Sequence, residues 1–294
     1  MNRWTSWASN IQPHRKGLTV DLGPMRLVII AEKNGKPALK AARRGVEQAV
    51  QALCEVSKFW GELKKPAPEI RAEGYPRIIR LMVEACQMTG DDTLTPMAAV
   101  AGAISDAAAE AAQMEGAEKV VVENRGDIAV KVSGGASARI GVKASIKAQR
   151  CSFTIKVDGG SGIGGVATSG IGGIGFTKGM ASAAVALAST GALADACSTI
   201  LGNATLDENS PVVWKLAEEL DPLTDLKGQL VTYEVGRLTW KSKIRAVKNG
   251  IRKVEELRSR GILKGGIIVV KEFFAMAPRT IAKVEDKNLH QIVL

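Results

Sequence analysis

Histidine and aromatic residues are scarce in this chain of 294 residues. The two histidines, His14 and His290, lie near the two ends of the sequence. Zinc sites and Ser-His or Cys-His catalysis usually depend on histidine, so this shortage argues against both. Aromatic residues make up only 4% of the chain, which leaves few side chains to stack on bases. We therefore do not expect nucleic acid as a partner.

Paired cysteine motifs and long apolar runs are also missing. The four cysteines show no C-x-x-C spacing, and we expect buried free thiols in a reducing compartment: Cys54, Cys86, Cys151 and Cys197. No uncharged apolar run reaches the roughly 18 residues that span a bilayer, since the best candidate, residues 180–201, contains Asp195. Residues 1–7 contain no apolar signal core. These absences predict a cytoplasmic protein without a membrane partner.

The formal net charge of +10 is concentrated in one stretch near the C-terminus. Residues 241–264 carry many lysines and arginines and only two acids, Glu255 and Glu256. One interpretation is the solvated face of a single helix, which is the commoner origin of such a run. The other is an anion-binding surface for a nucleotide or an acidic partner.

Hydrophobic periodicity predicts an α+β protein. Apolar residues at helical spacing predict helices at 37–63, 76–88, 96–114, 180–201, 211–220 and in the basic stretch after residue 240. Short alternating or apolar runs predict strands at 18–21, 26–31, 119–123, 127–132, 138–142, 152–157, 229–235 and 266–270. Because the strands follow one another as a meander, we predict an α+β fold, a mixed sheet with packed helices.

Two segments together indicate a site for a phosphate-bearing ligand. The first is the glycine-rich stretch 159–179, where turns without Cβ atoms can expose backbone N–H groups to phosphate oxygens. In the second, Asp195 and Thr199 are four residues apart, so on a helix they share a face and can hold one hard cation such as Mg²⁺. Two plainer explanations remain open: close backbone packing for the glycines, and capping of a neighbouring loop for Asp195.

Common nucleotide and hydrolase motifs do not fit this stretch. Residues 162–167 match G-x-G-x-x-A, but a second glycine-rich turn follows where a dinucleotide fingerprint requires a helix. Lys178 is followed by Gly179, so a Walker pattern is excluded. Ser169 lacks the G-x-S-x-G context of a nucleophile.

Three segments taken in order resemble a known family. They are T-P-M-A-A-V-A-G-A at 95–103, N-R-G-D-I-A at 124–129, and G-V-A-T-S-G at 165–170 followed by A-D-A-C-S-T at 194–199. Over about residues 15–235 the chain is similar to the uncharacterised ApbE-like family. Its members are small relatives of the ApbE-type transferases, which attach FMN from FAD to a Thr or Ser of a flavoprotein in a Mg²⁺-dependent reaction.

The resemblance implies an architecture and a set of site residues. It implies an ApbE-like, T-fold-related domain at 1–235, made of two intimate subdomains with a ligand cleft between them. A C-terminal extension at 236–294, a basic helix plus a strand, would pack on the same domain. Asp195 and Thr199 correspond to the side chains that hold Mg²⁺, with a backbone carbonyl near Val100 as a third ligand. The residues that correspond to the site for FAD or a related nucleotide are Thr95, Met97, Gly102, Asp106, Asn124, Gly126, Asp127, Thr168, Ser169 and Gly170, and Asp127 is the candidate catalytic residue.

Departures from the transferases leave three functions open. Ala101 stands where they have a lysine, Arg125 replaces a glycine of their N-G-G-D turn, and their H-x-x-D-P-R-T-G segment is absent. The chain could bind flavin and transfer FMN, bind flavin or a nucleotide without transfer, or use the same cleft for another anionic ligand in sulfur or amino-acid metabolism. In the last case a thiolate of Cys151 or Cys197 would be relevant. The expected partners are a small anionic ligand, a flavoprotein acceptor if transfer occurs, and a second copy of the chain if Trp4 and Trp7 anchor a homodimer.

Overall fold

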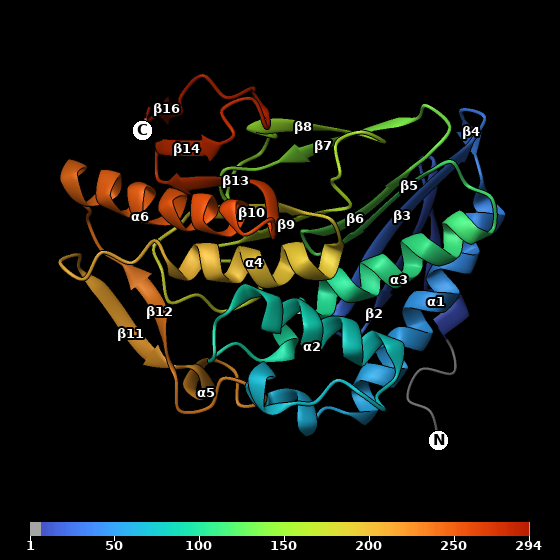
Figure 1. Ribbon diagram of the computed structural model, residues 1–294, viewed down its shortest axis with the longest axis horizontal. Helices are drawn as coiled ribbons and strands as arrows, with labels where there is room; N and C mark the ends of the chain where they lie inside the picture. Colours follow the sequence, from blue (N-terminus) through green and yellow to red (C-terminus); the bar gives the residue numbers. More distant parts are fainter. Residues whose placement is uncertain (1–6, 294) are drawn as a thin grey trace. The chain divides into compact units, whose positions relative to one another are not determined.

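The computed structural model describes residues 7–293 (Figure 1). The chain divides into two compact units. Unit 1 comprises Met1–Ala138, Val157–Ala167 and Ala188–Asp195, and unit 2 comprises Arg139–Lys156, Thr168–Leu187 and Ala196–Leu294. The predicted boundary after residue 235 falls inside unit 2. Trp4 and the side chain of Trp7, on which the homodimer expectation rests, lie outside the described part of the chain.

Unit 1 is built on an antiparallel sheet with the strand order β1-β2-β3-β5-β6-β9. The strands are β1 (Ile11–His14), β2 (Gly17–Leu22), β3 (Met25–Lys33), β5 (Lys119–Asn124), β6 (Asp127–Val132) and the first residues of β9 (Gly165–Ser169), with β4 (Lys36–Pro37) paired to the end of β3. The predicted hairpin around Gly23 is confirmed, since Leu22 pairs with Met25. Along β3, Leu27, Ile29 and Ala31 are fully buried while the residues between them are more exposed, so one face of the sheet forms the core.

Unit 1 has three helices, of which the first and third lie on that core and the second packs against the other two. They are α1 (Leu39–Lys58), α2 (Arg77–Thr89) and α3 (Val100–Met114), with short 3₁₀ turns η1 (Trp7–Asn10), η2 (Glu62–Lys64), η3 (Ala67–Glu69) and η4 (Pro96–Ala99). Figure 1 shows α1 and α3 side by side along the sheet, where α3 contacts β5 and β6. Gly45 permits this close approach, because a Cβ there would lie 2.8 Å from the carbonyl oxygen of Ala108. The helices predicted at 76–88 and 96–114 are confirmed.

Unit 2 contains three groups of strands. In the first group the strand order is β10 (Ala183–Ala188), β13 (Leu263–Val270), β14 (Phe273–Ala277) and β16 (His290–Gln291). In the second group the order is β15 (Lys283–Val284), β8 (Phe153–Asp158) and β7 (Ser137–Val142). In the third group β11 (Val212–Leu216) pairs with β12 (Leu230–Val235). Strands β14 and β16 pair in parallel, whereas β13 and β14 pair antiparallel. The rings of Phe153 and Phe274 meet edge to face at 5.2 Å and are fully buried or nearly so.

The helices of unit 2 surround these strands. They are α5 (Ala217–Leu220), α6 (Trp240–Ser259) and the part of α4 (Gly191–Asn203) that begins at Ala196. The basic helix α6 starts at Thr239, whose hydroxyl accepts a hydrogen bond from the N–H of Ser242 at 3.1 Å. Its buried face packs on β13 and β14. The α+β class is confirmed, with mixed strand pairing and packed helices.

Two predicted helices are wrong. The segment 180–201 is not one helix, because Ala183–Ala188 forms strand β10 and α4 begins only at Gly191. All six residues of β10 are buried, and a strand buried on both faces has no alternation to distinguish it from a buried helix. The helix predicted at 211–220 is strand β11 followed by the single turn α5. Among the described residues, none of the helices is both long and apolar enough to cross a membrane.

Candidate functional site

In unit 1 the first residues of α3 and of α4 meet and cap each other. The N–H groups of Gly191 and Ala192 donate to the two carboxylate oxygens of Asp106, at 2.8 and 2.9 Å. In return, the N–H of Gly102 donates to Oδ2 of Asp195 at 2.9 Å, and the N–H of Ala101 also bonds this carboxylate. Each helix therefore supplies an acid that satisfies the free N–H groups at the start of the other, where the helix dipole also favours a negative charge.

Glycine is required at the point of contact. A Cβ at Gly102 would overlap the carbonyl group of Gly191, and one at Gly191 would lie 2.8 Å from the carbonyl oxygen of Gly102. Gly102, Asp106 and Asp195 were predicted from the sequence as site residues, whereas Gly191 was not. A signal was present, since G-A-I-S-D-A at 102–107 and G-A-L-A-D-A at 191–196 carry the same Gly-x-x-x-Asp spacing.

Burial raises the pKa of both carboxyl groups. The pKa of Asp106 rises to about 6 because burial outweighs the two N–H groups of Ala192 and Gly191, which stabilise the ionised form. The pKa of Asp195 is also raised, chiefly by burial and further by the neighbouring charge of Asp106. A cation brought to this place would favour the ionised forms of both acids.

The turn Asn124–Asp127 lies against the first turns of α3. Asn124 pairs with Asp127 across the β5–β6 hairpin, and the Ser105 hydroxyl donates to the carbonyl oxygen of Asp127 at 3.0 Å. The Nδ2 of Asn124 reaches the carbonyl oxygen of Ala101 at 3.4 Å. Asn124 is only 3% exposed, and its Oδ1 is buried. This oxygen accepts no hydrogen bond from the residues that the structure describes. A buried acceptor without a donor is rare in native structures, and a water molecule, an ion or a ligand group can satisfy it.

Arg125 at the tip of this turn adopts a left-handed backbone conformation, and its side chain forms a hydrogen bond with a neighbouring loop. Arg125 and Gly126 have φ values of +56° and +106°, as expected for the two central residues of a tight hairpin turn. The Nε–H of Arg125 donates to the carbonyl oxygen of Pro24 at 2.9 Å, and the N–H of Gly126 donates to Oε1 of Glu123 at 2.7 Å. Arg125 in place of a glycine of the N-G-G-D turn therefore leaves a two-residue turn intact.

Close packing explains two glycines that were expected to expose their amides. Cβ atoms at Gly164 and Gly165 would overlap the carbonyl oxygens of Ser189 and Thr190. The N–H of Gly164 donates to the carbonyl oxygen of Ala188 at 2.9 Å, so it is not available to a phosphate. The packing explanation holds at these two positions.

The remaining predicted residues are distributed over both units. Thr95 and Met97 lie in unit 1 in the segment leading into α3, where the carbonyl oxygen of Thr95 accepts a hydrogen bond from the Cys86 thiol at 3.3 Å. Thr168 and Ser169, predicted in a turn, are the last residues of strand β9, and only Gly170 follows the strand. All three lie in unit 2, where a Cβ at Gly170 would lie 2.9 Å from the carbonyl oxygen of Ser182.

The predicted metal ligands Asp195 and Thr199 fall in different units, so their pairing stays a prediction. Within residues 7–293, no three His, Cys, Asp or Glu side chains are arranged to hold a metal ion.

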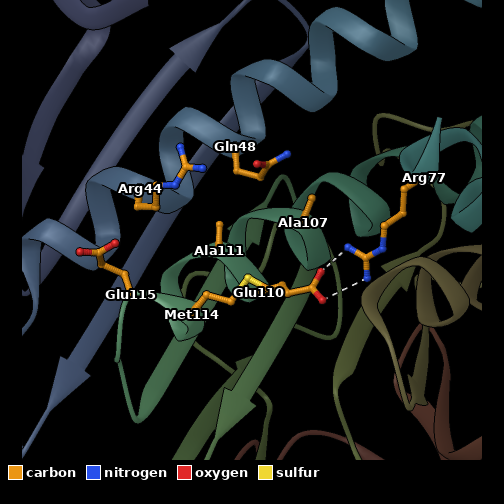
Figure 2. A pocket seen from close by; sticks show the side chains of 8 residues that line it. All are labelled: Arg44, Gln48, Arg77, Ala107, Glu110, Ala111, Met114 and Glu115. Atoms are coloured by element: carbon orange, nitrogen blue, oxygen red, sulfur yellow. Dashed lines mark hydrogen bonds and ion pairs between the residues drawn. The ribbon is translucent and has the colours of Figure 1, made fainter.

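A hollow of about 290 Å³ lies elsewhere in unit 1, on the outer side of the helices (Figure 2). Side chains from α1, α2 and the end of α3 line it: Arg44, Gln48, Arg77, Ala107, Glu110, Ala111, Met114 and Glu115. Its charges are paired, since Arg77 forms a two-point ion pair with Glu110 and Glu115 pairs with Lys40. None of the predicted site residues lines this hollow.

Comparison with known proteins identifies the family. A family model described as "AbpE bacteria" matches residues 8–280. The chain belongs to this family. The match covers both units and includes most of the segment after residue 235, which the sequence resemblance did not reach.

Similar proteins from methanogens carry no functional name. A UPF0280 protein of Methanosarcina acetivorans is 37% identical over 132 residues, covering 45% of this chain and 50% of that protein. A UPF0280 protein of Methanococcus aeolicus is 29% identical over 157 residues, covering 53% and 62%. The chain thus spans between half and about three fifths of the length of the curated relatives that it matches.

Among solved structures, the apo form of the Pseudomonas stutzeri flavinyl transferase ApbE is similar, with 13% identity, a TM-score of 0.44, and coverage of 91% of this chain and 93% of that one.

Proposed function

We propose that this member of the AbpE bacteria family binds a flavin dinucleotide, or a related dinucleotide phosphate, beside the start of α3. The supporting observation is the buried Oδ1 of Asn124, which lacks a donor in the described part of the protein. An unsatisfied buried acceptor costs roughly 1–3 kcal/mol, and a ligand donor such as the imide N–H of a flavin ring would remove that cost. Asn124 also belongs to the turn that resembles the flavin-site turn of the transferases.

The acids beside this turn suit a cation. A carboxylate has about four lone-pair positions, so the two N–H groups of Gly102 and Ala101 leave Asp195 able to bind a hard ion. In this proposal Asp195 and Thr199 hold Mg²⁺, which when bound neutralises phosphate charge as a Lewis acid. Asp106 then acts by holding the start of α4, through Gly191 and Ala192, rather than by touching the ligand.

Transfer of FMN to a protein is the finer part of the proposal. The acceptor hydroxyl oxygen would form a phosphoester bond to the FMN phosphorus of FAD, the pyrophosphate bond would break, and AMP would leave. Asp127 would accept the proton of the attacking hydroxyl, and its backbone is held in place by the hydroxyl of Ser105. Binding without transfer is the second candidate, and the missing lysine at Ala101 favours it. A Cys197 thiolate has no support, because burial raises the pKa of this thiol to about 12.

Titration of the protein with FAD, with and without Mg²⁺, tests the proposal. We expect saturable quenching of flavin fluorescence that is stronger with Mg²⁺, and that Thr199→Val removes the Mg²⁺ effect while keeping the shape of the side chain. Asp195→Ala is a poor test, because it leaves the N–H groups of Gly102 and Ala101 without their acceptor. Absence of saturable FAD binding in either condition would refute the proposal.

A second measurement separates transfer from binding. The protein is incubated with FAD, Mg²⁺ and a candidate flavoprotein, and the acceptor is analysed by mass spectrometry. A mass increase equal to bound FMN, lost in Asp127→Asn, supports transfer. Tight FAD binding without a mass change supports the binding protein instead.

A further inference from the structure

The whole formal net charge of the protein belongs to unit 2. This unit holds 22 of the 40 lysines and arginines but only 12 of the 30 acids, so it carries +10 and unit 1 is balanced. Two of its segments, Arg139–Lys156 and Thr168–Leu187, together contain six basic residues and no acid. Neither segment therefore contains an acid that could neutralise its own cations.

The basic helix α6 differs in this respect. Several of its cations form ion pairs with acids of unit 2: Lys243 with Glu272, Arg245 with Asp207, Lys253 with Glu256, and Arg258 with Glu255. Most of this helix is thus a solvated, ion-paired face, which was the plainer of the two interpretations of its sequence. Three cations of the helix, Lys241, Lys248 and Arg252, have no ion pair within residues 7–293, but the two acid-free segments carry six of the ten net positive charges of unit 2.

The loops of these segments touch each other. The β7–β8 loop, residues 143–152, contacts the glycine-rich loop, residues 170–178, since a Cβ at Gly172 would lie 3.2 Å from Cγ2 of Ile146. Lys143, Lys147 and Arg150 are exposed on the first loop. None of the three forms an ion pair with any acid in the described range 7–293. Three free cations thus lie on a loop that contacts an exposed glycine-rich backbone.

The glycine-rich loop offers free amides. Its ends are anchored, because the N–H of Ile171 donates to the carbonyl oxygen of Ala181 at 2.9 Å and that of Lys178 donates to Oδ1 of Asn203 at 2.8 Å. Between these anchors, the backbone N–H groups of residues 174–176 donate to no acceptor in the described part of the chain. Successive free amides next to unpaired cations are the groups that bind phosphate oxygens.

We infer that these two loops of unit 2 bind the diphosphate or oligophosphate group of a small-molecule ligand. The inference goes beyond the proposed function, because it assigns a phosphate site to unit 2 and uses none of the contacts proposed for the flavin ring. Nucleic acid is not favoured, because the two acid-free segments contain two aromatic residues, and one of them, Phe153, is fully buried.

Pyrophosphate, which has no flavin, is the probe that tests this site. We compare the wild type with Lys143→Gln/Lys147→Gln, and with Lys241→Gln/Lys248→Gln as a control that removes the same charge from exposed positions of α6. At constant low ionic strength, calorimetric titration should show saturable binding that weakens roughly tenfold in the loop variant and less than about twofold in the α6 variant. Amide resonances of residues 174–176 should shift on titration.

The possible results separate this inference from the proposed function. Pyrophosphate binding that depends on the loop lysines, without FAD binding, would support the loops and refute the flavin ligand. FAD binding that is equal in all three proteins, with no saturable pyrophosphate binding, would overturn the loop assignment and leave the flavin proposal standing. Equal losses of pyrophosphate affinity in the loop variant and the α6 variant would also overturn the loop assignment, since they would show a non-specific effect of charge. Preferential binding of a single-stranded oligonucleotide through the same lysines would overturn the small-ligand assignment.

Discussion

Replacing Asn124 by leucine should change stability and ligand affinity in opposite directions, because the buried Oδ1 costs stability in the free protein and accepts a hydrogen bond from the bound ligand. Leucine has nearly the same shape and removes Oδ1, whose burial without a donor costs roughly 1–3 kcal/mol. The variant also loses the 3.4 Å contact of Nδ2 with the carbonyl oxygen of Ala101, which at that length is worth under about 1 kcal/mol. We expect the ligand-free protein to be more stable by about 1 kcal/mol, or about 2 °C in Tm.

Binding should change in the opposite direction. If a ligand N–H donates to Oδ1, the leucine variant leaves that donor unsatisfied and FAD affinity falls roughly tenfold. Denaturant unfolding and flavin fluorescence measure the two effects.

Asn249→Leu is the matched control, because Nδ2 of Asn249 donates to the carbonyl oxygen of Leu206 at 3.1 Å. We expect this control to lose about 1 kcal/mol of stability and keep its FAD affinity. Equal destabilisation of the two variants, or unchanged FAD affinity in Asn124→Leu, would refute the reasoning.

Three further predictions concern the crossing of the helices and the thiols. The pKa of Asp106 is raised from 3.8 to about 6, so ionisation of this carboxyl group destabilises the fold. The stability of the wild type relative to Asp106→Asn should therefore fall by about 3 kcal/mol in all as the pH rises from about 3 to about 7, with about 2 kcal/mol of this loss between pH 4 and pH 6. Urea unfolding of both proteins at each pH measures the difference, and a flat difference would contradict the prediction. Gly102→Ala should lower the free energy of unfolding by roughly 3 kcal/mol or more, because its Cβ would overlap the backbone of α4. The control Gly61→Ala, whose Cβ would have no atom within 4 Å, should leave stability nearly unchanged. Similar losses of stability in the two variants would rule out the close crossing. Iodoacetamide at pH 8 should label the exposed Cys151 in the native protein and spare Cys197, which is buried and has its pKa raised to about 12. Peptide mass spectrometry shows which thiol reacts, and rapid labelling of Cys197 would disprove its burial.

Local patterns were sufficient for much of unit 1. The helices α2 and α3 follow from apolar spacing bounded by Gly90 and Pro96, and the β5–β6 hairpin follows from the turn residues between two apolar runs. These features depend on neighbours within a few residues, which a sequence displays directly. The resemblance to the ApbE-like family also depended on short segments, and the family match from residue 8 to 280 confirms it.

Patterns failed where burial is complete on all sides. Strand β10 consists of alanine, valine and leucine, and the sequence around it read as one helix because neither period is visible in a uniformly apolar run. The glycines at 164 and 165 were also misinterpreted, because a sequence does not show whether a bare backbone faces a ligand or another backbone. Only the positions of Ser189 and Thr190 decide this.

The sequence by itself determined the family, the α+β class and most helices and hairpins, and it marked Asp106 and Asp195 as candidate site residues. The tertiary structure alone decided what those acids touch. Gly102 and Asp195 are 93 residues apart, and Gly191 and Asp106 are 85 apart, so their pairing depends on how the sheet of unit 1 brings the two helix starts together. Contacts over such separations are set by strand register and helix packing, which no local pattern of residues encodes.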